Sequence, residues 1–195
     1  ALFSRRAPIC PVPEIVFGSM PNDGGHLLLS EDEKAEMLAI EPSAEKWIRP
    51  FLGAEEFING TPRWCLWLVG ISPAELRSMP LVAERVEAVR RHRLQSRRET
   101  TRELADYPTL FGENRHPESS YILVPGVSSE RRSYIPIGFM PSTTIASNAT
   151  LIIPNAGLYH FGILSSAMHM AWVRHVAGRL NSDYRYSNQI VYNNF

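Results

Sequence analysis

Leu158–Gly178, with the sequence LYHFGILSSAMHMAWVRHVAG, is the segment that most limits how this chain can fold. Its length and apolar composition predict a helix, and Gly178 is a typical residue to end one. A helix that is apolar around most of its surface has to be buried against other elements. No run of roughly 18 or more apolar residues occurs, so the sequence predicts a core helix and no membrane-spanning segment.

Strands are the elements expected to cover this helix. Arg63–Val69 is rich in aromatic and apolar residues and follows a hairpin-type dipeptide, Asn59–Gly60. Thr143–Pro154 is expected to break near Asn148. The remaining strand-like segments are Glu14–Phe17, Ser120–Pro125 and Arg132–Phe139.

Leu81–Leu104 predicts a second long helix. It is highly charged, but an apolar stripe at helical spacing runs along it. That stripe comprises Leu81, Val82, Val86, Val89 and Leu94. The expected fold class is α+β: a small, mostly antiparallel sheet packed by two long helices, with short acidic helices in the N-terminal part.

The N-terminal part begins with residues 1–25, which are rich in Pro and Gly and predict an extended connector that ends in a turn. Ser30 and Glu33 match a capping box, so a helix over Glu31–Ile40 is expected. A second short helix is expected to be ended by Pro50. Ser72 followed by Pro73 predicts the start of a helical turn.

The net charge of zero hides an asymmetry along the chain. Residues 1–60 hold 5 Lys and Arg against 10 Asp and Glu, whereas residues 61–195 hold 15 Arg against 10 Asp and Glu. Arg binds planar, bidentate partners such as carboxylate, phosphate and guanine. Composition alone favours surface ion pairs over a nucleic-acid partner.

No metal site is predicted. His160, His169 and His175 share one expected helix, but their spacings of nine and six residues do not bring two ligands to one face. Cys10 and Cys65 have no nearby Cys partner. Two separate thiols predict a reduced, cytoplasmic setting.

The sequence also lacks the patterns of a self-contained enzyme. Ser128 and Ser129 have no G-x-S-x-G context, and Glu55–Glu56 is typical of a solvated helix end. Neither G-x-G-x-x-G nor a Walker loop is present. We therefore predict no catalytic residue and no cofactor within this chain.

Nucleic-acid contact is the chemistry that remains. The segment SSERRSYIP, residues 128–136, combines hydroxyls, two Arg and a Tyr that suit phosphate contacts. SNAT at 147–150 and NSDYRYSN at 181–188 add short polar side chains able to reach base edges. The Arg-rich helix expected over Leu81–Leu104 is a weaker candidate, because four Glu dilute its charge.

Four long phrases resemble the target-recognition region of MmeI-like (type IIL) restriction–modification enzymes. These enzymes are adenine-specific DNA methyltransferases, often fused to a nuclease. The phrases follow the order of the family and cover essentially the whole chain. They are GSMPNDGGHLLLS, FLGAEEFINGTPRWCLWL, SSERRSYIPIGF and LIIPNAGLYHFGILSSAMHMAWVRHVAGRLNSDYRYSNQIVYNNF.

The resemblance implies a role within a larger enzyme. Its parent is expected to contain an endonuclease, a helical connector, an S-adenosylmethionine-dependent methyltransferase domain, this domain and a C-terminal helical part. The Asn-Pro-Pro-[Phe/Tyr] motif that handles the flipped adenine is absent here. The chain is therefore expected to recognise double-stranded DNA, with residues 1–25 as the connector from the methyltransferase domain and residues 26–195 as the recognition domain.

The resemblance also assigns residues. Members of the family differ at the two variable positions of GRLxSxYRYS, here Asn181 and Asp183, which read one base pair. The phrase IASNATLII supplies Asn148 and Ala149, and Gly126 is a further candidate for base recognition. The expected phosphate-contacting or positioning residues are Ser128, Ser129, Arg131, Arg132 and Arg185, the last either positioning or reading.

The base preference of the variable pair follows from chemistry. Asp183 is expected to accept from the amino group of cytosine, hence to select a G·C pair with the guanine on the other strand, and such a contact discriminates by roughly 1–3 kcal/mol. In the family the pair often carries opposite charges, whereas Asn181 is neutral. Asn181 either supports the neighbouring edge or reads nothing specific.

An interaction module without DNA contact is the alternative function. It would dock the methyltransferase domain of the same chain through its acidic half. In both cases the sequence, which begins with Ala1 rather than Met, is expected to be an excised piece of a longer protein.

Overall fold

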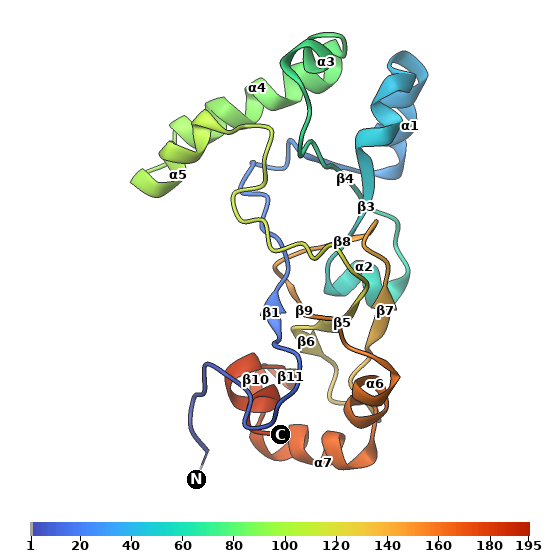
Figure 1. Ribbon diagram of the computed structural model, residues 1–195, viewed down its shortest axis with the longest axis vertical. Coiled ribbons are helices and arrows are strands. Elements are labelled where there is room, and N and C mark those ends of the chain that lie inside the picture. The colour runs from blue at the N-terminus through green and yellow to red at the C-terminus, as the bar shows by residue number, and fades with distance from the viewer. Residues whose placement is uncertain (1) are drawn as a thin grey trace. The chain divides into compact units, whose positions relative to one another are not determined.

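The computed structural model describes residues 2–195, which form two compact units. The α+β class with antiparallel sheets is confirmed (Figure 1). Unit 1 comprises Ala1–Gly18, Gly53–Gly60 and Arg115–Phe195, and unit 2 comprises Ser19–Leu52 and Thr61–Asn114. Over the described residues, none of the helices has both the length and the apolar composition needed to cross a bilayer.

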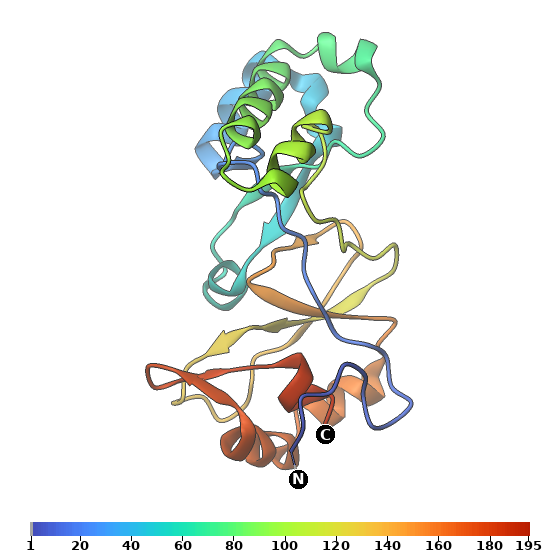
Figure 2. The same cartoon turned by 90° about the vertical axis from the view of Figure 1, so that its left-hand side faces the viewer.

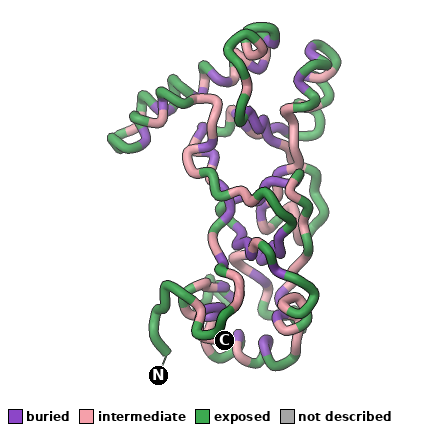
Figure 3. Tube along the Cα trace, viewed as in Figure 1, coloured by how far each residue is buried: buried purple, intermediate pink, exposed green. Residues whose placement is uncertain are grey.

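Unit 1 is built around an antiparallel sheet with the strand order β1-β9-β5-β7. The strands are β1 (Val16–Phe17), β5 (Tyr121–Pro125), β7 (Gly138–Met140) and β9 (Thr150–Pro154). Leu123 of β5 lies opposite Ile152 of β9 in the centre of the sheet. All five residues of β5 are buried, which explains its continuous apolar sequence (Figure 3).

The predicted break near Asn148 is confirmed. A short strand, β8 (Ile145–Ala146), is followed by a turn, and β9 begins at Thr150. The predicted strand Arg132–Phe139 is wrong over most of its length, because only Gly138–Met140 is extended and paired. Pro136 in this segment has no N–H to donate to a neighbouring strand.

A second antiparallel sheet of unit 1 has the order β10-β11-β6. Its strands are β6 (Val127–Ser128), β10 (Gly178–Leu180) and β11 (Asp183–Arg185). The polar stretch after the apolar helix is therefore a hairpin, and the expectation that Gly178 ends a helix is wrong because Gly178 begins β10. Leu180 pairs with Asp183, so Asn181 and Ser182 form a two-residue turn.

The predicted helix Leu158–Gly178 is divided by two serines. The Ser166 hydroxyl accepts a hydrogen bond from the His169 N–H at 3.1 Å and so starts a new helix. The helical elements of unit 1 are α2 (Ala54–Asn59), α6 (Leu158–Leu164), α7 (Ala167–Val176) and a π-helical turn, η3 (Asn188–Tyr192).

One apolar cluster holds unit 1 together. Side chains from both sheets, from α6 and α7 and from the last residues of the chain pack in it. Its members are Ile15, Ile122, Val124, Ile135, Leu151, Ile153, Ala156, Leu164, Met170, Val173, Tyr184, Tyr186, Val191 and Tyr192. The hairpin strand β11 is thus fixed to the core through Tyr184.

The polar residues near Phe195 bind the N-terminal segment, which lies beside them in Figure 2. The Ile9 N–H donates to the Asn193 carbonyl at 3.1 Å, and Asn193 Nδ2 donates to the Arg5 carbonyl at 2.8 Å. The Tyr192 hydroxyl donates to the Pro13 carbonyl at 2.7 Å. These three hydrogen bonds pair backbone groups of the Pro-rich segment that no sheet pairs.

Unit 2 contains three antiparallel strands in the order β2-β4-β3. They are β2 (Leu28–Leu29), β3 (Ile48–Leu52) and β4 (Trp64–Leu66). The predicted helix ended by Pro50 is wrong, because only η1 (Pro42–Trp47), a 3₁₀-helix, precedes a strand that contains Pro50. Pro50 lies opposite Trp64 in that strand pair.

Two helices of unit 2 begin at the serines predicted to cap them. The predicted helix Glu31–Ile40 is confirmed as α1, with the capping box of Ser30 and Glu33 in place. Ser72 caps α3 through the Glu75 N–H at 3.2 Å, as predicted. The remaining helices are α3 (Pro73–Arg77), α4 (Pro80–Leu94), α5 (Glu99–Glu103) and the 3₁₀-helix η2 (Leu104–Asp106).

The prediction of one continuous helix over Leu81–Leu104 is wrong, because α4 ends at Leu94 and α5 begins only at Glu99. The Ser96 hydroxyl accepts from the Arg98 N–H at 3.2 Å, a local bond that competes with helical pairing. The predicted apolar stripe also ends differently, since Leu94 is exposed and Arg93 takes the buried position.

Arg93 is fully buried, and all its guanidinium nitrogens donate to backbone carbonyls. Five hydrogen bonds of 2.7–3.0 Å reach the carbonyls of Pro21, Asn22, Leu104, Tyr107 and Leu110. Burial lowers the pKa of Arg93, while the charge of Asp23 raises it. The side chain thus connects α4 to the loop at Pro21 and Asn22 and to the segment from η2 to Leu110.

Replacing Arg93 should destabilise unit 2. We expect Arg93→Met to lower the free energy of unfolding by at least about 3 kcal/mol, because five carbonyls lose a charged donor. Arg93→Lys should recover part of the loss, since an ammonium has three donors. Urea unfolding followed by tryptophan fluorescence measures the change. Arg90→Met, an exposed arginine on α4, is the matched control and should stay within about 0.5 kcal/mol of wild type; equal effects at both positions would contradict this role.

Candidate nucleic-acid interface

Two short turns of unit 1 carry the four residues predicted to read bases. Asn148 and Ala149 are the exposed central residues of the turn between β8 and β9. That turn is closed by the Thr150 N–H, which donates to the Ser147 carbonyl at 2.9 Å. The Ser147 hydroxyl also accepts from the Ala149 N–H at 3.2 Å, so the turn is held by its own backbone and side chain.

The second turn is the tip of the β10–β11 hairpin. Asn181 is exposed and has a φ of 54°, a left-handed conformation that Asn adopts more readily than most residues. Asp183 begins β11 and is half-buried. The side chains of Asp183 and Arg185 lie on one face of β11 because they are two residues apart, whereas Tyr184 faces the core.

Gly126 connects the β8–β9 turn to the base of the hairpin, at the end opposite its tip. Its N–H donates to the Ala149 carbonyl at 3.2 Å, and its carbonyl accepts from the Tyr186 N–H at 2.9 Å. A Cβ at this position would lie 2.9 Å from the Ala149 oxygen, so only glycine allows the approach without a shift. Gly126 therefore sets the distance between the segments that carry Asn148 and Arg185.

The segment after β6 brings the predicted phosphate-contacting residues to the hairpin. The Glu130 N–H donates to Asp183 Oδ1 at 3.4 Å, and Figure 2 shows this segment beside the hairpin tip. Arg131 and Arg132 are exposed there. Asp183 and the two arginines are thus neighbours along one edge of unit 1.

Ser128 and Ser129 differ in access. Ser129 is half-buried, and its hydroxyl accepts from the Arg131 N–H at 3.4 Å. Ser128 lies opposite Tyr184 on the inner face of the sheet and is only 2% exposed. Within the described residues its hydroxyl has no hydrogen-bond partner. Because its hydroxyl is buried, Ser128 does not present it for the direct phosphate contact expected from the sequence. Its place is within the fold.

Two residues of this surface, Arg179 and Glu130, lie in motifs quoted from the sequence but were given no role there. Arg179 of β10 stacks on the Tyr184 ring, with 4.0 Å between the guanidinium carbon and the ring centroid. Its Nη1 lies 3.8 Å from Glu130 Oε2 and donates to the Ser182 carbonyl at 2.8 Å. Arg179 and Glu130 come together only because β10 pairs with β11 and β11 pairs with β6.

The inner side of this surface rests on a buried polar pair. His169 Nε2 lies 3.0 Å from the Tyr186 hydroxyl, and His169 is 1% exposed. Burial lowers the pKa of His169 to about 4 and raises the pKa of Tyr186 above its usual range. Both side chains are therefore neutral at pH 7, and His169 is a core residue.

The Arg-rich segment of unit 2 is less suited to phosphates than its composition indicates. Arg93 is buried on carbonyls, and Arg85 pairs with Glu33 at 2.6 Å. Arg102 donates to the carbonyls of Ser96 and Arg97. Fewer exposed arginines therefore remain for phosphates than the seven that Leu81–Leu104 contains.

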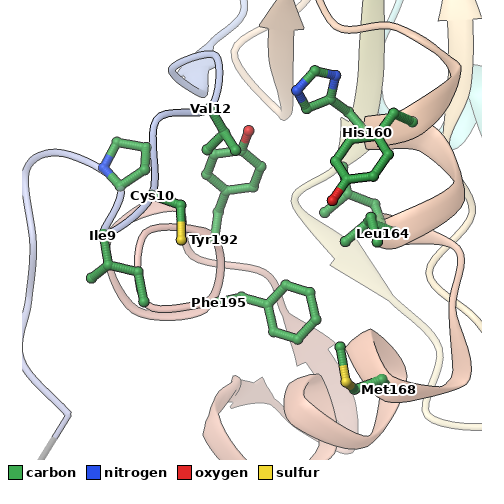
Figure 4. A pocket seen from close by; sticks show the side chains of 11 residues that line it. Ile9, Cys10, Val12, His160, Leu164, Met168, Tyr192 and Phe195 are labelled. Atoms are coloured by element: carbon green, nitrogen blue, oxygen red, sulfur yellow. The ribbon is translucent and has the colours of Figure 1, made fainter.

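Unit 1 also has an apolar pocket of about 250 Å³ between the N-terminal segment and α6 (Figure 4). Ile9, Leu164, Met168 and Phe195 line it. His160 is at its edge, but His160 Nδ1 accepts from the Gly157 N–H at 3.1 Å and thereby caps α6. Across residues 2–195, no group of three or more His, Cys, Asp or Glu side chains is arranged to hold a metal ion.

The chain matches the family described as "MmeI, target recognition domain" over residues 2–195. It belongs to this family. The resemblance inferred from the sequence is thereby confirmed.

Relatives of the MmeI target recognition domain family support the same placement. DNA methyltransferase A of Bacillus subtilis (strain 168) is 43% identical over 192 residues, which cover 98% of this chain and 22% of that protein. The type IIL restriction–modification enzyme MmeI, whose structure was solved in complex with DNA, is 46% identical with a TM-score of 0.95. That match covers 98% of this chain and 26% of the MmeI chain, so the chain spans about a quarter of these relatives.

The buried His169 should make this member of the MmeI target recognition domain family sensitive to acid. Its folded pKa of about 4 lies below the ordinary 6.5, so the unfolded state binds more protons between these values. The stabilisation is complete above pH 6.5 and is lost as the pH falls toward 4, by about 3 kcal/mol.

Urea unfolding at pH 7 and pH 4 measures this loss. His169→Gln should remove that part of the pH dependence, whereas His175→Gln, at an exposed position of α7, should retain it. An unchanged pH dependence in His169→Gln would show that other groups are responsible.

Proposed function

We propose that this chain is the sequence-reading domain of an adenine-specific DNA methyltransferase of the type IIL kind. The observation that carries the proposal is its likeness to MmeI, with a TM-score of 0.95 and 46% identity to a protein solved in complex with DNA. The exposed β8–β9 turn and the tip of the β10–β11 hairpin are the surface best suited to this role. An interaction module without DNA contact is not favoured, because the relatives include a DNA methyltransferase and a DNA complex.

The full-length enzyme divides the work between domains in this proposal. A base inside a duplex has to leave the stack before it can be methylated, so the rest of the site must be held while it is flipped. The separate methyltransferase domain of the same chain binds S-adenosylmethionine and transfers the methyl group. The residues described here bind double-stranded DNA and select the site, and no catalytic residue is assigned to them.

Base reading is assigned to the turn residues. Asp183 accepts from the cytosine N4 amino group, and Asn148 is suited to pair with adenine N6 and N7. Ala149 is small and exposed, which suits an apolar contact with a thymine methyl group. Arg185, on the same face of β11 as Asp183, either reads guanine or binds a phosphate.

Phosphate contacts are assigned to Arg131 and Arg132, which are exposed beside the hairpin. Such contacts fix the register of a protein on the duplex and carry no sequence information. Ser129 orders the segment through the Arg131 N–H, and Ser128 anchors it on the inner face of the sheet. Gly126 acts through its backbone, which connects the β8–β9 turn to the residue that follows β11.

Asp183 should determine one base pair of the methylated site. We expect Asp183→Asn in the full-length enzyme to lower discrimination at that pair by about tenfold, because an amide presents a donor as well as an acceptor to cytosine N4. Methylation-sensitive sequencing of exposed DNA reads the change at each position of the site. An unaltered methylated sequence would exclude Asp183 as a reading residue.

Asn181 needs a variant that leaves its turn intact. Asn181→Gly tolerates the φ of 54° and removes only the side chain, whereas Asn181→Ala also strains the turn. If Asn181 reads a base, both variants should change the methylated sequence. If only the turn matters, Asn181→Ala alone should do so.

The two exposed arginines should control the salt dependence of binding. We expect the Arg131→Met, Arg132→Met double variant to reduce the slope of log Kobs against log salt by about 1.8, the value for two lost phosphate contacts. Fluorescence anisotropy with duplex DNA at several salt concentrations measures the slope.

Arg97→Met with Arg98→Met is the matched control, since both are adjacent exposed arginines of unit 2. Its slope should equal that of wild type. If the control pair reduces the slope more than the test pair does, the phosphate contacts lie in the Arg-rich segment. Absence of DNA binding at any salt concentration by the full-length enzyme would favour the interaction-module function.

A further inference from the structure

The hairpin strand β10 has little to hold it in place. It lies at the edge of its sheet, paired with β11 on one side. All three of its residues are exposed, so none is anchored in the core. Its end nevertheless carries the turn of Asn181 and Ser182, on which base reading depends in the function proposed above. A contact other than the backbone hydrogen bonds between β10 and β11 has to fix this turn.

Arg179 supplies that contact from the inner face of the hairpin. It lies opposite Tyr184 in the strand pair, and its guanidinium carbon is 4.0 Å from the centroid of the Tyr184 ring. Tyr184 is 5% exposed and belongs to the core cluster, so the stacked guanidinium connects the edge strand to the core. The planar guanidinium suits this stacking better than an ammonium does.

The same guanidinium also closes the turn. Arg179 Nη1 donates to the Ser182 carbonyl at 2.8 Å, and Ser182 is the second residue of the turn. Arg179 thus holds the position immediately before Asp183. Its side chain is on the face of the sheet opposite to Asp183 and Arg185, because Arg179 pairs with Tyr184. Arg179 therefore supports Asp183 and Arg185 from behind the surface that they present.

Glu130 extends the support to the other side of Asp183. Its carboxylate lies 3.8 Å from Arg179 Nη1, and its backbone N–H donates to Asp183 Oδ1 at 3.4 Å. One residue therefore contacts the supporting arginine through its side chain and the reading carboxylate through its backbone. The backbone of Asp183 thus follows the turn that Arg179 closes, and its carboxylate is contacted by the segment after β6.

We propose that Arg179 is a positioning residue for base recognition, with Glu130 as its partner. Arg179 fixes the hairpin turn on Tyr184 and Ser182, and Glu130 transmits this placement to Asp183. The inference rests on the DNA-reading function proposed above. Discrimination at the base pair read by Asp183 should depend on Arg179, although Arg179 itself contacts neither that base pair nor the flipped base.

The full-length enzyme with Arg179→Met tests the proposal. Duplexes that contain the methylated sequence, and others with one base pair changed, are compared by initial methylation rate and by anisotropy. The pair read by Asp183 is identified as the one at which Asp183→Asn loses discrimination. At this pair Arg179→Met should lower discrimination by about tenfold, and at the other pairs by less than about twofold, since a displaced carboxylate loses roughly one good base contact.

Matched variants separate positioning from charge and from folding. Arg179→Lys keeps the charge but not the planar stack, so its discrimination should fall between those of Met and wild type. Glu130→Gln keeps the backbone N–H to Asp183 and should have a smaller effect than Arg179→Met. Arg77→Met, at an exposed arginine of α3, should leave every ratio unchanged. If Arg179→Met does not fold, Arg179→Lys supplies the same comparison.

Two outcomes would overturn the inference while leaving the proposed function in place. In the first, Asp183→Asn alters one pair but Arg179→Met alters none. In the second, Arg179→Met weakens binding to all duplexes equally and flattens the salt slope, which would make Arg179 a phosphate contact. If Asp183→Asn alters no pair, the assignment of base reading to the hairpin fails, and the role of Arg179 fails with it.

Discussion

The two backbone hydrogen bonds of Gly126 are the constraint on which the proposed recognition surface depends. They connect the β8–β9 turn, through Ala149, to Tyr186, the residue that follows β11 at the base of the hairpin. The segments that carry these partners are distant in the sequence and belong to different sheets. A Cβ at position 126 would lie 2.9 Å from the Ala149 oxygen, so glycine allows the β8–β9 turn to approach the base of the hairpin this closely. Glycine here contributes geometry that no functional group could replace.

The arginines of the chain show how one residue type serves three purposes. Arg93 is buried and binds five carbonyls, so it organises loops that lack regular structure. Arg179 stacks on a core tyrosine and closes a turn. Arg131 and Arg132 are exposed and suited to phosphates. Net charge and composition count all of these arginines alike. The charge asymmetry along the sequence therefore did not identify the interface.

Sequence reasoning succeeded where a structural signal is local. The capping box of Ser30 and Glu33 placed α1 correctly, because both hydrogen bonds lie within one helical turn. It failed where a distant contact decided the outcome. Arg93 replaced Leu94 on the buried face because its carbonyl partners lie in loops that no periodicity predicts. The long apolar helix was expected without a break, although Ser166 carried a capping signal that explains it.

The candidate site followed the same pattern. The resemblance supplied Asn181 and Asp183, but the hairpin that presents them was not expected, since its strands are short and largely polar. Ser128 was expected to face a phosphate, yet strand alternation directs it inward, opposite Tyr184. Arg179 and Glu130 were missed because their contacts join strands whose pairing has no sequence signature.

The left-handed conformation of Asn181 has a consequence for how new binding preferences can arise in such a domain. Position 183 lies in extended backbone, where one side chain can be exchanged for another with little effect on the main chain. At position 181 an exchange changes both the functional group and the set of backbone conformations that the turn accepts. The two positions of the proposed recognition pair therefore differ in mutability. Position 183 can vary independently, whereas position 181 can vary only together with the shape of the turn that contains it.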